Sequence, residues 1–133
     1  MRLRSPRPTN AAQALFQTAC LEAAELSFVV GVEHLVLACA LHGALDVDPD
    51  EIRERIVDDE RDALASLGIS LDSVRGELGE RLGDACGLPV SPHAKRMLEL
   101  ATRRRRHVSA EQLLATLREH SATARRLLAA LQA

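Results

Sequence analysis

The stretch that decides the fold is GVEHLVL, residues Gly31–Leu37, and a similar stretch, SAEQLLA, occupies residues Ser109–Ala115. In each stretch a small residue stands where a helix would begin, a glutamate follows two residues later, and an apolar run comes next. A second helix start precedes each stretch, at Thr9 in the first half and at Ser91 in the second half. Because internal similarity of this kind indicates a repeat architecture, the sequence predicts two degenerate copies of one helical unit.

The composition suits a single domain of packed helices. Of the 133 residues 47% are hydrophobic, but Phe16 and Phe28 are the only aromatic residues, so leucine, valine, isoleucine and alanine must build the core. The net charge of −2 does not point to a nucleic acid or a membrane as partner. Three cysteines without CxxC spacing favour a reducing compartment. We therefore expect a cytoplasmic protein with no signal peptide and no membrane span.

Apolar residues spaced three and four apart predict about seven helices, and no segment has the alternation of a strand, so the expected fold class is all-α. The predicted helices cover residues 9–26, 31–41, 48–67, 70–82 and 91–106, and two more begin at 109 and 121. The second helix should be central and buried because it is apolar nearly all round. Glutamine or glutamate three residues after a capping residue predicts capping boxes for Asp48 with Glu51 and for Ser109 with Gln112.

The third predicted helix is amphipathic and has clear signals at both ends. Pro49 suits the first helical position, and Gly68 suits a C-terminal stop. Its inward-facing residues should be Ile52, Ile56, Leu64 and Leu67.

Three stretches together resemble the N-terminal double-repeat domain of the Clp unfoldases, particularly the ClpC type. Gly31–Leu35 (GVEHL) is similar to the GTEH[IL] segment of that family. Leu67–Arg75 (LGISLDSVR) is similar to the loop and helix that close its first repeat. Leu88–Leu100 (LPVSPHAKRMLEL) is similar to its PFTPRAKxxLEL signature, which opens the second repeat and is the most specific of the three.

The resemblance implies a division of the chain into arm, repeat, linker and repeat. The flexible arm would cover 1–8, the first repeat 9–83 with an insertion near 44–58, the linker 84–90, and the second, shortened repeat 91–133. Lys95 is the only lysine and lies outside any GxxxxGK[ST] motif, so the sequence predicts no phosphate-binding loop. The chain would therefore be a stand-alone relative of the Clp N-terminal domain without the ATPase module, and not an enzyme.

In the ClpC family the two repeats carry pockets that recognise phosphoarginine, a degradation mark. By position these pockets correspond to Thr9 with Glu33, and to Ser91 with Glu111. The chemistry is plausible from the residues themselves, because a carboxylate binds a guanidinium in a bidentate manner and a helix N-terminus binds phosphate. The plainer alternative is that the hydroxyls only cap helices and the glutamates only complement helix dipoles.

The resemblance thus implies a protein- or peptide-binding module with no cofactor. Its ligands would be phosphoarginine-marked or unfolded clients, a ClpC-type unfoldase or the adaptors of such an unfoldase, and it would act as an adaptor or as a decoy for a Clp protease. In actinobacterial relatives such domains are also targets of cyclic-peptide antibiotics. No membrane partner is expected.

Other signals in the sequence are weaker. Arg103–Arg106 is the basis of an alternative, a nucleic-acid-binding regulator, but a solvated helix C-terminus accounts for such a run more simply because no aromatic residue is near to stack on a base. His34, Cys39 and His42 lie within one helix, yet a metal site would need further ligands. A small hydrolase is the least favoured class, since no nucleophile motif with a base is present.

Overall fold

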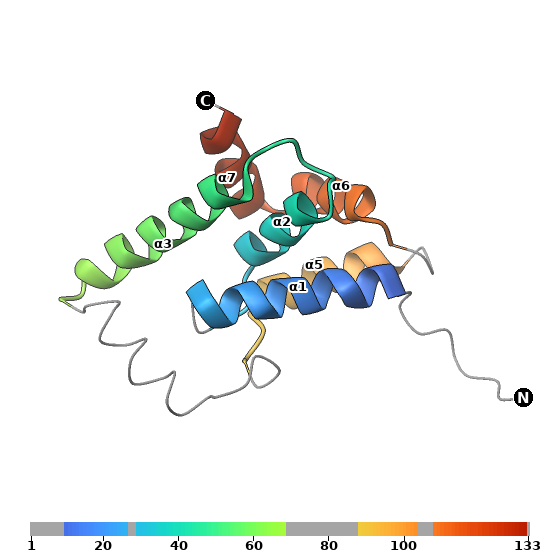
Figure 1. Ribbon diagram of the computed structural model, residues 1–133. Coiled ribbons are helices and arrows are strands. Elements are labelled where there is room, and N and C mark those ends of the chain that lie inside the picture. The colour runs from blue at the N-terminus through green and yellow to red at the C-terminus, as the bar shows by residue number, and fades with distance from the viewer. Residues whose placement is uncertain (1–9, 27–28, 69–87, 104–107, 133) are drawn as a thin grey trace, which may run out of the picture.

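The computed structural model describes residues 10–26, 29–68, 88–103 and 108–132, and this part of the chain is all-α (Figure 1). Its six helices are α1 (Asn10–Leu26), α2 (Val32–Leu41), α3 (Pro49–Ala65), α5 (Pro92–Arg103), α6 (Ala110–His120) and α7 (Ala122–Gln132). The predicted fold class is confirmed for these residues. The predicted helix over 70–82, the cap at Thr9 and residues 104–106 of the arginine run lie outside the described residues.

Helix α2 is the centre of the fold, as predicted. It packs against α1, α3, α5, α6 and α7, and Figure 1 shows it between these helices. Every residue from Val32 to Ala40 is buried except Glu33, which is half-buried. The helix ends at His42 and Gly43, where a φ of +87° makes glycine the favoured residue. A helix that is apolar all round must be enclosed, and here the other helices enclose it.

At each end of α3 one sequence prediction is confirmed and one is wrong. Asp48 Oδ1 accepts a hydrogen bond of 2.9 Å from the Asp50 backbone N–H, whereas Glu51 is exposed and forms no capping box in the part of the chain described. Ile52 and Ile56 are buried, but Leu67 is 73% exposed, so the prediction of an inward-facing Leu67 is wrong. This end of α3 extends away from α2 in Figure 1. Gly68, with φ at +76°, follows the helix as the predicted stop.

The starts of α2 and α6 have similar capping geometry. The Ser109 N–H donates to Gln112 Oε1 over 3.0 Å, and Ser109 Oγ accepts from the Gln112 N–H over 3.2 Å, so the predicted capping box is confirmed. At the equivalent place in the first half, the Gly31 N–H donates to His34 Nδ1 over 2.9 Å. The side chain three residues into each helix therefore bonds back to the residue before the helix.

The segments that precede α2 and α5 are joined by one parallel β-bridge between Val30 and Val90. The Val30 N–H donates to the Pro89 carbonyl, and the Ser91 N–H donates to the Val30 carbonyl, each over 2.9 Å. This bridge brings the N-termini of α2 and α5 together. Among the described helices, none combines the length and the apolar character that crossing a lipid bilayer demands.

Candidate functional site

The structure describes three of the four predicted site residues. Glu33 lies in the first turn of α2, and its side chain is 31% exposed. Ser91 precedes α5 and caps it, because Ser91 Oγ accepts a 3.1 Å hydrogen bond from the Ala94 N–H. Glu111 lies in the first turn of α6 and is exposed. Thr9 lies outside the described residues.

The structure associates Ser91 with the helix of Glu33, whereas the resemblance pairs Ser91 with Glu111. Ser91 is bonded through its backbone to Val30, three residues before Glu33. His93, two residues after Ser91, is close enough to lower the pKa of Glu33 through its charge. The negative charge of Glu111, in contrast, acts on Cys39, which lies about 10 Å along the α2 axis from the start of that helix.

Gly31 provides the space that the Glu33 side chain occupies. Its backbone is extended, with φ at −110° and ψ at 177°, so any residue could adopt this conformation. A Cβ at position 31 would collide with the Glu33 carboxyl group, 2.8 Å from Cδ and 2.9 Å from Oε2. The glycine therefore lets the carboxylate fold back over the start of α2, and this role was not apparent from the sequence.

Neighbouring groups shift the pKa of the Glu33 carboxyl group in both directions. Burial raises its pKa above the usual value, and the nearby charge of Asp59 raises it further. Its own backbone N–H and His93 act in the opposite direction. The carboxylate is thus held at a helix N-terminus and is partly shielded from water, so its pairing with a cation is stronger than at an open surface.

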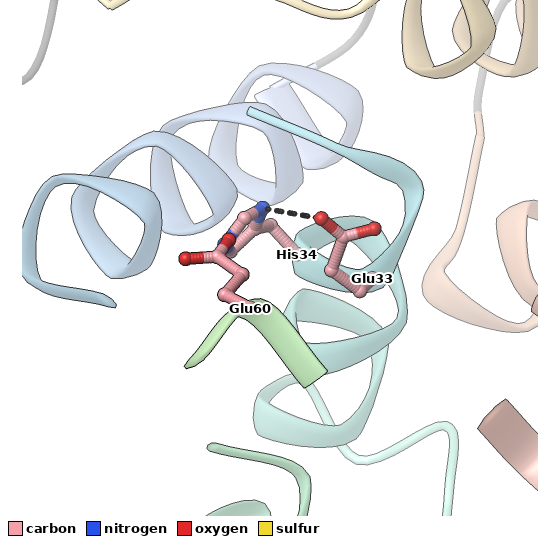
Figure 2. Close-up of side chains that lie close together, drawn as sticks. All are labelled: Glu33, His34 and Glu60. Carbon is pink, nitrogen blue, oxygen red and sulfur yellow. Dashed lines mark ion pairs between the residues drawn. The ribbon is translucent and has the colours of Figure 1, made fainter. Parts of the chain in front are cut away.

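His34 is fully buried and neutral. Its Nδ1 accepts the Gly31 N–H, so the ring proton must be on Nε2, and burial lowers the pKa of the imidazole to about 4. Nε2 has no hydrogen-bond partner among the described residues. Figure 2 shows Glu60 reaching from α3 to this ring while Glu33 lies on its Nδ1 side, 3.7 Å away.

One oxygen or nitrogen atom from each of Glu33, His34 and Glu60 lies within 4.8 Å of the other two, so these three side chains are close enough together to be considered as metal ligands. The position of the single proton on the neutral imidazole disfavours metal binding, however. The Nδ1 lone pair already accepts the Gly31 N–H, and Nε2 carries the proton, so neither nitrogen offers a free lone pair. We interpret Glu33, His34 and Glu60 as a cluster of polar side chains that lies beneath α3.

The other metal candidates from the sequence do not gather around one point. Burial raises the pKa of the Cys39 thiol to about 12, so this cysteine is a protonated, apolar-like core residue. His42 is exposed, and its Nε2 lies 2.9 Å from the Thr18 hydroxyl in a hydrogen bond between α1 and the end of α2.

A cavity of about 470 Å³ lies between α3 and α7 and reaches Glu33. We call it the α3–α7 groove. Its lining combines three carboxylates with two guanidinium groups and a few apolar residues, namely Glu33, Asp59 and Glu60, Arg55 and Arg126, and Ile56, Ala63, Leu127 and Ala130. The sequence did not indicate this groove because it depends on which faces of α3 and α7 line the same cavity beside α2.

No protein-family model matches the chain, and no curated protein matches it either. The functional interpretation therefore depends on the residues and geometry described above.

Proposed function

We propose that the protein is a non-catalytic peptide-binding module, similar in role to a Clp N-terminal domain, that binds phosphoarginine-marked or unfolded clients as an adaptor or decoy for a Clp protease. The observation that carries the proposal is the half-buried carboxylate of Glu33 at the start of α2, with Ser91 and the start of α5 beside it.

The two parts of a phosphoarginine side chain have complementary groups at this place. The guanidinium carries several N–H donors in a planar fork, which match the two oxygens of Glu33. The phosphoryl group would face the N-termini of α2 and α5, which the bridge between Val30 and Val90 holds together. Helix N-termini bind phosphate through free backbone N–H groups and the positive end of the dipole.

Glu111 on α6 is the candidate for a second, weaker site. It is exposed in the first turn of a helix whose start has capping geometry similar to that of α2. Its carboxylate is exposed and therefore open to a ligand. Ser109 stands two residues before it, however, where Gly31 provides the space for the Glu33 side chain. We therefore assign the principal contact to Glu33.

Isothermal titration calorimetry with free phosphoarginine tests this function. Wild-type protein should release or absorb heat on binding, and Glu33→Gln should weaken the affinity about tenfold or more because the charge-assisted bonds are lost. Glu119→Gln, which neutralises an exposed carboxylate at the far end of α6, is the matched control and should bind as wild type. Absence of heat with wild type, or equal affinities for wild type and Glu33→Gln, would contradict the proposal.

A further inference from the structure

We infer that the α3–α7 groove binds a segment of a partner protein in which a cationic, an apolar and an acidic side chain follow one another. This inference extends the proposed binding function to an unmodified peptide and uses residues of α3 and α7 that the phosphoarginine contact does not need.

The cationic side chain would occupy the end of the groove near α2. Glu33 and Asp59 both line the groove, and the negative charge of Asp59 acts on the Glu33 carboxylate. The neutral ring of His34 contributes no compensating charge. Like charges that act on each other repel, so a guanidinium or ammonium group between them is favoured.

The acidic side chain would face the arginines of the groove. Arg55 on α3 and Arg126 on α7 are exposed, and neither forms an ion pair with any described residue. Two guanidinium groups from neighbouring helices are suited to hold one carboxylate. The groove thus presents both signs of charge without pairing them with each other.

The apolar side chain would lie between the two charged ends. The buried residues Ile56 and Leu127 form the base of the groove, and the small residues Ala63 and Ala130 leave its length open. The cavity volume of about 470 Å³ lies within the range of established ligand sites. Charge complementarity at both ends therefore favours a peptide of mixed charge over a purely apolar helix.

The test is a chemical-shift titration of ¹⁵N-labelled protein with the peptide acetyl-Arg-Leu-Asp-amide. We expect shifts at the amides of Ala63, Ala130 and Thr123, which also lines the groove, and we expect acetyl-Gln-Leu-Asn-amide, which has no charges, to bind about tenfold more weakly or not at all. Arg126→Glu should weaken binding of the first peptide by a similar factor, whereas acetyl-Arg-Leu-Lys-amide should bind this variant better than it binds wild type.

Glu54→Lys changes an exposed charge on α3 outside the groove and should leave peptide binding unaltered. Equal shifts with the charged and the neutral peptide, or no shifts with either, would overturn the inference. Heat with phosphoarginine but no shifts with acetyl-Arg-Leu-Asp-amide would overturn the groove proposal alone and leave the proposed function standing.

Discussion

Replacing His34 by glutamine should make the protein less sensitive to acid. In the native state the imidazole is buried and neutral with its pKa lowered to about 4, while in the unfolded chain the pKa returns to the ordinary 6.5. Below pH 6.5 the His34 ring binds a proton in the unfolded state but not in the native state. The free energy of unfolding therefore decreases as the pH falls below 6.5. Above pH 6.5 the ring is unprotonated in both states, so this destabilisation disappears.

The magnitude follows from the difference between these two pKa values. Each pKa unit corresponds to roughly 1.4 kcal/mol, so the native state loses about 2 kcal/mol by pH 5 and about 3 kcal/mol by pH 4 relative to neutral pH. Glutamine at position 34 should retain the helix start, since Gln112 already accepts the equivalent backbone N–H of Ser109 over 3.0 Å. The variant loses ring packing at every pH, but it has no proton to take up.

Urea denaturation followed by circular dichroism, at neutral pH and at about pH 5, measures this difference. Wild type should lose about 2 kcal/mol more stability than His34→Gln over this interval. His120→Gln removes an exposed histidine at the end of α6 and should behave as wild type. Equal losses for wild type and His34→Gln would refute the assignment of a buried, neutral imidazole.

Three further substitutions test the packing and the helix starts. Gly31→Ala should change the free energy of unfolding by less than about 1 kcal/mol, because its backbone conformation is allowed, yet it should displace the Glu33 carboxyl group and weaken phosphoarginine binding in calorimetry; unchanged affinity would contradict the space argument. Ser91→Ala removes the cap of α5 and should cost about 1 kcal/mol in urea denaturation, a value near zero being the contrary result. Ile52→Ala, at a fully buried position, should cost about 2–5 kcal/mol, and a loss below about 1 kcal/mol would mean that α3 does not pack as described.

Much of the fold could be predicted because the local signals act over a few residues. The cap of Asp48, the capping box of Ser109 with Gln112 and the all-round apolar pattern of α2 each depend on neighbours in sequence, and the structure agrees with each. The inward orientation of Leu67 failed because periodicity shows which face of a helix is apolar and not how far along that face another element extends. Whether a residue is covered is a property of the tertiary arrangement.

The sequence predicted the helix-start positions of Glu33 and Ser91, but not which residues lie beside them. The position of Glu33 at a helix start follows from the sequence, as does the capping role of Ser91. That Ser91 lies beside the helix of Glu33 depends on the bridge between Val30 and Val90, a contact across the two halves. The α3–α7 groove required the same long-range information, since its charges come from three helices, α2, α3 and α7.

The central claim is that the Glu33 carboxylate at the start of α2 contacts the ligand. It is tested most directly by following the ¹³Cδ resonance of Glu33 through a pH titration with and without saturating phosphoarginine. The account predicts that the ligand lowers the pKa of Glu33, because the bound guanidinium stabilises the charged carboxylate. Saturation of the protein with phosphoarginine while the Glu33 resonance and its pKa remain unchanged would contradict it.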